Sequence, residues 1–87
     1  LTLILQLGTY AQQKTEISGR ITDLESQAIA EATVLIVEAT SNQIIKATFS
    51  DENGNFTFND INSTAFKIEI LLDGTKQFTS EVFARAE

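Results

Sequence analysis

The chain has 87 residues, enough for one domain, and 43% of them are aliphatic or aromatic, a normal globular share. Six basic and twelve acidic side chains give a net charge of −6, which argues against nucleic-acid phosphates and against adsorption to anionic lipid. Cys and His are both absent, which excludes disulfides, thiolate nucleophiles and thiolate metal sites and removes the commonest metal ligand and general base.

The first eleven residues have the pattern of the later part of a secretory signal peptide. The run 1–7, LTLILQL, is almost purely apolar and ends at Gly8, and Thr9 and Ala11 then place small residues at −3 and −1 of a cleavage point. A transmembrane helix needs about 20 apolar residues, and this run is much shorter. We therefore predict a partial signal peptide over 1–11 and one mature domain over 12–87. The alternative is a first β-strand.

The residue after the predicted cleavage point bears on membrane anchoring. A bacterial lipoprotein carries its lipid on a Cys at that position, whereas this chain has Gln12. We therefore expect no lipid at this end of the mature chain.

From residue 15 onward the pattern is one of short strands and turns. We predict strands over 17–22, 32–37, 44–49, 56–58 and 66–72, and a last one in which Phe78, Ser80 and Val82 share one face and Phe83 lies on the other. The segment 32–37, ATVLIV, is apolar on both faces, as expected of a central strand. Polar turns are predicted at 23–27, 40–43, 60–64 and 73–74. We predict a loop over 24–32, because its apolar residues complete no helical stripe.

Asn53-Gly54 between two apolar runs is a strong hairpin signal. The strand that follows should place Phe56 and Phe58 on one face, and each Phe would cost about 3–5 kcal/mol on truncation to Ala if it anchors the core. Six or seven short strands joined by tight turns predict an all-β sandwich or a small barrel.

Five stretches of the chain follow one pattern: 17–23 (ISGRITD), 28–36 (AIAEATVLI), 48–58 (TFSDENGNFTF), Ile61 and 66–70 (FKIEI). This pattern resembles the carboxypeptidase regulatory-like domain, a transthyretin-like fold, from about residue 17 to residue 83. The resemblance implies an antiparallel β-sandwich of seven strands (six to seven).

Three small residues in this pattern, two glycines and one alanine, are expected to have steric or backbone roles. Gly19 stands where a neighbouring strand passes so close that a side chain would clash, and Ala32 is small enough for close packing against the opposite sheet. Gly54, in the turn begun by Asp51, should take a positive φ. The family usually has a Gly in the loop before the second strand, where this chain has Ser26 and Gln27.

The resemblance also implies a function. Domains of this kind often follow a signal peptide in proteins of Bacteroidetes-like bacteria and precede a TonB-dependent plug and an outer-membrane β-barrel. This context implies a non-catalytic periplasmic accessory or interaction domain, whose partner is another protein or the remainder of its own longer chain. The alternatives are a secreted carbohydrate-binding-like or adhesive module and an accessory domain of a secreted metallocarboxypeptidase.

Two acidic features are candidate sites. The loop 51–55 has oxygen donors spaced somewhat like a calcium loop, but it lacks the distal bidentate Glu and is interpreted as a plain turn. Glu52 and Asp60 would be the paired carboxylates of a hydrolase, yet no local pattern brings them together. We predict no catalytic, cofactor-binding or metal-binding residue and no cofactor.

Glycan chemistry also has little support in the sequence. Asn55-Phe-Thr57 and Asn62-Ser-Thr64 match the glycosylation sequon, which we interpret as chance in a bacterial chain. Sugar-binding sites usually stack the ring on Trp or Tyr, whereas Trp is absent and the one Tyr, Tyr10, falls in the predicted signal. All six Phe residues are expected in the core, so direct glycan binding is disfavoured.

Overall fold

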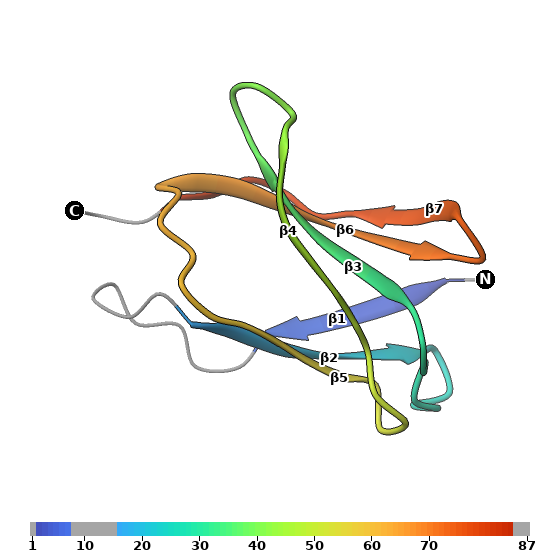
Figure 1. The fold of residues 1–87 in the computed structure, drawn as a ribbon. Coiled ribbons are helices and arrows are strands. Elements are labelled where there is room, and N and C mark those ends of the chain that lie inside the picture. The colour runs from blue at the N-terminus through green and yellow to red at the C-terminus, as the bar shows by residue number, and fades with distance from the viewer. Residues whose placement is uncertain (1, 8–15, 85–87) are drawn as a thin grey trace.

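The computed structural model describes residues 2–7 and 16–84 (Figure 1). These residues form eight strands and no helix: β1 (Leu3–Leu7), β2 (Ile17–Asp23), β3 (Thr33–Glu38), β4 (Ile44–Phe49), β5 (Asn55–Phe58), β6 (Ala65–Leu72), β7 (Thr75–Thr79) and β8 (Phe83–Ala84). The described part of the chain therefore contains no helix long and apolar enough to cross a membrane. The predicted all-β class is confirmed.

The strands form two facing antiparallel sheets, the layers of a β-sandwich (Figure 1). One sheet has the order β1-β2-β5, and the other has the order β4-β3-β6-β7, with β8 also paired to β6. The arrangement is that of a transthyretin-like sandwich, as expected.

The core lies between the two sheets and is made of side chains at alternate strand positions. Period-two alternation sends every second side chain to the same face, so β2, β3, β5 and β6 each contribute two or three buried residues. Both sheets contribute fully buried side chains to one cluster: Ile17, Ile21, Phe56 and Phe58 from the smaller sheet, and Val34, Ile36, Phe66, Ile68 and Ile70 from the larger. Each such side chain stabilises the fold by about 1.5–3 kcal/mol relative to exposure.

The prediction of a central strand over 32–37 is confirmed. β3 lies between β4 and β6, and its inward residues Val34 and Ile36 are fully buried. Leu35 and Val37, on the other face, are also buried, although no further layer covers that face in the described residues. The loop over 24–32 is confirmed as well, because it contains no helical residue.

The turn at Asn53-Gly54 forms, but the hairpin predicted there is wrong. β4 belongs to the larger sheet and β5 to the smaller one, so the turn carries the chain from one layer to the other. The Ile21 amide of β2 donates to the Gly54 carbonyl oxygen at 2.8 Å, and the residues that follow Gly54 pair with β2 instead of β4.

The tight two-residue hairpin lies instead at Asp73-Gly74, where the sequence indicated only a turn. Both residues have positive φ, 51° and 80°, as a type I′ turn requires, and Leu72 pairs directly with Thr75. The predicted last strand is therefore misplaced. β7 begins with polar residues, which the apolar pattern did not predict to be part of a strand. It ends before Val82, which is about half exposed.

The N-terminal apolar run forms a strand in the structure. β1 pairs antiparallel with β2, with Leu3 opposite Asp23 and Leu7 opposite Gly19, so the structure shows the strand that was the alternative interpretation of this run. The predicted cleavage point after Ala11 lies outside the described residues. Signal-peptide function of this segment stays a prediction.

Candidate functional site

Two turns at the same end of the sandwich share one design. In the turn at 51–55, the Asp51 carboxylate oxygen Oδ1 accepts the amides of Asn53 and Asn55, both at 2.9 Å. Asp51 also exchanges two backbone bonds with the turn, since its amide donates to the Asn55 carbonyl and its carbonyl accepts the Gly54 amide. Oδ1 of Asp51 is therefore bound to the backbone of the turn, as in a plain turn.

The turn at 23–27 repeats this pattern bond for bond. Oδ1 of Asp23 accepts the amides of Glu25 and Gln27, at 2.8 and 3.0 Å. The Asp23 amide donates to the Gln27 carbonyl, and its own carbonyl accepts the Ser26 amide. Ser26 occupies the position that Gly54 has in the other turn, with φ of 64° against 78°. A serine therefore stands where the turn geometry favours glycine.

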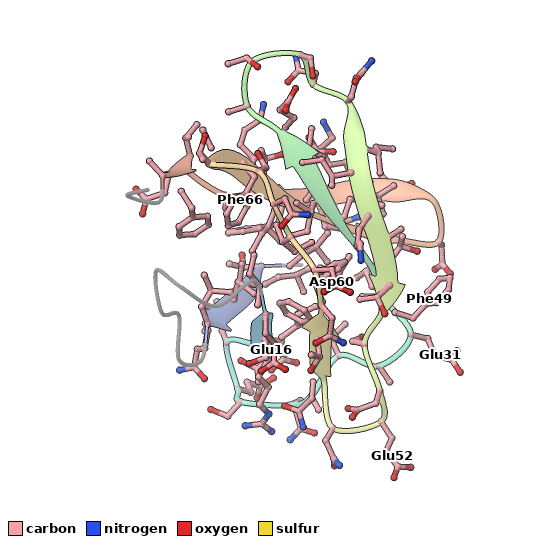
Figure 2. The ribbon with its side chains drawn as sticks, turned by 60° about the vertical axis from the view of Figure 1, so that its left-hand side comes forward. Glu16, Glu31, Phe49, Glu52, Asp60 and Phe66 are labelled. Carbon is pink, nitrogen blue, oxygen red and sulfur yellow. The ribbon has the colours of Figure 1, made fainter. Side chains whose placement is uncertain are left out.

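The two carboxylates considered for hydrolysis lie apart. Glu52 projects from the tip of the inter-sheet turn, and Asp60 lies beyond the other end of β5 (Figure 2). The four residues of β5 alone span about 13 Å, which is more than any glycosidase carboxyl pair tolerates. Among residues 2–7 and 16–84, no group of three His, Cys, Asp or Glu side chains is arranged to hold a metal ion. The predicted lack of catalytic and metal residues stays a prediction for the whole protein.

The basic side chains of the described residues are engaged locally. Arg20 Nε donates to the Asn53 carbonyl at 3.0 Å, and Lys46 Nζ donates to the Asn59 carbonyl at 2.6 Å. Lys67 Nζ donates to Asn42 Oδ1, and Lys76 Nζ lies 3.3 Å from Glu69 Oε2. These four are all of the Lys and Arg residues in the described ranges. They are dispersed over both sheets, so they form no anion-binding patch there.

Phe49 corrects the expectation that all six Phe residues are in the core. Phe56 and Phe58 are buried with their ring centroids 5.8 Å apart, and Phe66 is buried against Phe83 at 5.7 Å. Phe49, in contrast, is 68% exposed and points away from the interior occupied by Phe66 (Figure 2).

A β-bulge explains the outward direction of Phe49. β4 places Ile44 opposite Val37 and Lys46 opposite Ile36, so Ile45 is an extra residue in the ladder. One inserted residue reverses the side-chain alternation beyond it. Ile45 packs on the core, while Phe49 lies opposite Thr33 on the outer face.

Sequence reasoning missed two serines that organise the backbone. Ser50 is buried, and its hydroxyl donates to the Ile29 carbonyl at 2.7 Å and accepts the Ala32 amide at 3.0 Å. Ser80 Oγ accepts the Ile68 amide at 2.8 Å where β7 has ended. Serine is usually exposed, so neither position carries a local signal.

The close approach predicted at Gly19 is confirmed. A Cβ there would lie 2.6 Å from the backbone oxygen of Gln6 and 2.8 Å from the Phe56 ring. Ala32 is fully buried, and Gly54 has the predicted positive φ.

One hollow lies where the open sides of the two sheets meet. Leu5 and Leu7 of β1 line it from one side, and Phe78 of β7 and Phe83 of β8 line it from the other. Its volume is about 540 Å³, and Glu81 is the one ionisable residue among the described residues that line it. The hollow is thus a mainly apolar opening at one side of the sandwich.

The described residues form an all-β sandwich in which the side chains of Asp23 and Asp51 hold two turns. The family model described as the carboxypeptidase regulatory-like domain matches residues 16–87, which is most of the chain. The chain therefore belongs to the carboxypeptidase regulatory-like domain family, whose domains are non-catalytic. No curated protein and no solved structure gives a significant match.

Proposed function

We propose that this chain is a non-catalytic interaction domain of a larger exported protein. In its specific form, the domain lies in the periplasm at the N-terminal side of an outer-membrane receptor or β-barrel of the TonB-dependent kind. The observation that carries the proposal is the family match over the whole of β2 to β8. The partner is then a protein or a further part of the same polypeptide.

The surface chemistry supports an interaction role over an enzymatic one. The carboxylates of Asp23 and Asp51 hold turns, and each Lys or Arg side chain in the described ranges contacts an oxygen of the domain itself. The apolar run before Gly8, with Thr9 and Ala11 at the predicted cleavage point, supports export.

The test is to read the gene on both sides of this chain and to locate its product. We expect an initiator Met with basic residues upstream, and a plug and barrel in frame downstream. An antibody against the sandwich should then detect the protein in the outer-membrane fraction. A zinc carboxypeptidase domain in the same frame, or a stop codon directly after Glu87, would contradict the proposal.

A further inference from the structure

β1 is an edge strand of the three-stranded sheet, and its ladder partner is β2 alone. It also lies outside the family match, which begins at residue 16. β1 is therefore an addition to the edge of a unit that the family defines without it.

β1 contacts the sandwich through its backbone and through one apolar face. Leu3 is buried in the core cluster, and Leu5 and Leu7 pack against that cluster, while Gln6 points outward and is exposed. Five consecutive residue pairs hold β1 in register against β2. Without β1, this length of the β2 backbone edge and the inner apolar face would both be open to water, and exposed strand edges of this kind readily take up another strand.

Gly19 shapes this edge for a strand. Gly19 lies opposite Leu7, and its missing side chain leaves space for the backbone oxygen of Gln6 and for the Phe56 ring. The backbone of β1 can therefore approach β2 closely at Gly19, where any larger residue would prevent this approach by steric clash.

We propose that the outer edge of β2 is a strand-acceptor site for an extended segment with aliphatic side chains at alternate positions. In this chain the site is occupied by Leu3–Leu7, and the same site takes such a segment from another protein by antiparallel strand addition when Leu3–Leu7 is absent. The acceptor itself goes beyond the proposed function. Only the event that empties it, cleavage after Ala11, depends on the proposed export.

The test uses the full chain with a specific protease site inserted between Ala11 and Gln12 and a fluorophore at the N-terminus. The protein is folded first, cut afterwards, and followed by gel filtration and fluorescence anisotropy. We expect the cut N-terminal fragment to elute with the sandwich. Excess peptide LTLILQL, with a charged tail for solubility, should displace it while the amide NMR spectrum of the sandwich stays dispersed.

Two peptide variants give the matched control, because both introduce the same carboxylate. L5E places Glu on the inward face and should raise the competing concentration at least tenfold, whereas Q6E places Glu on the exposed face and should change it less than threefold. Three results would overturn the proposal: immediate release of the fragment, equal competition by both variants, or replacement of the fragment by a second copy of the sandwich. Loss of the folded spectrum on displacement would also overturn it, since β1 would then be an integral strand. None of these results depends on cellular location, so this test can fail while the proposed function stands.

Discussion

Two aspartates of this domain, Asp23 and Asp51, stabilise turns by accepting hydrogen bonds from backbone amides. Asp23 and Asp51 each accept two amides two and four residues further on, and each turn then has one residue with a left-handed backbone, Ser26 or Gly54. The two turns differ in what surrounds that residue. A Cβ at Gly54 would collide with the Ile21 carbonyl oxygen, whereas Ser26 carries a side chain in the same conformation.

The first prediction concerns the serine of the 23–27 turn. Ser26→Gly should stabilise the domain by about 0.5 kcal/mol, because relief of a left-handed conformation, worth about 1–2 kcal/mol, exceeds the greater chain entropy of unfolded glycine. Urea unfolding of the full chain measures the change. The matched variant Gly54→Ser should destabilise by more than 2 kcal/mol, since strain and collision add. A destabilised Ser26→Gly would show that the serine side chain contributes more than its backbone strain costs.

At the scale of elements, turns decide where each strand goes. Asp73-Gly74 joins two paired strands of one sheet, while the Asp51 turn sends the chain across to the other layer. The Asp51 turn is not supported by ladder hydrogen bonds between the strands that it connects, because β4 and β5 do not pair. Its geometry rests on the Asp51 oxygen and on the bond from the Ile21 amide to the Gly54 carbonyl.

The second prediction follows from that dependence. Asp51→Ala removes the acceptor of two amide bonds and should destabilise the domain by about 1–2 kcal/mol. Asp51→Asn keeps a side-chain oxygen and should recover at least half of the loss. Thermal and urea unfolding of the three proteins provides the comparison. An Asn variant as unstable as the Ala variant would indicate that the carboxylate charge, and not hydrogen-bond acceptance, holds the turn.

At the scale of the whole molecule, the two sheets are unequal. β3 and β6 are flanked on both sides and provide the most buried inner face, whereas β1 is held at one edge. Stability within a domain follows such differences, because an edge strand can open without exposing the rest of the core.

The third prediction concerns hydrogen exchange of the full chain. Amides of Val34, Ile36, Ile68 and Ile70 should exchange only through global unfolding, and β1 amides should exchange at least a hundredfold faster. NMR-detected exchange in native buffer measures both sets. Equal protection of β1 and β6 would mean that β1 opens only with the whole domain, and would argue against a separable edge strand.

Much of this fold was accessible from sequence because the signals are local. The alternation in 17–22 and 66–72 identified β2 and β6 and their core faces, and the family pattern located Gly19, Ala32 and Gly54, all confirmed. The lack of Cys and His, which removes whole classes of site chemistry, is likewise a property of the sequence.

Only the tertiary structure decided which strands pair and on which face Phe49 lies. The bulge at Ile45 turns Phe49 outward, and the Asn53-Gly54 turn crosses between the sheets. The polar start of β7 pairs with β6 because the hairpin before it brings the two strands together. The N-terminal run 1–7 can serve as a leader or as a strand, and the structure pairs its residues Leu3–Leu7 with β2. The physical reason is common to all four cases. Strand pairing is made by backbone bonds between distant segments, and one extra residue or one available edge changes the outcome without changing the local pattern.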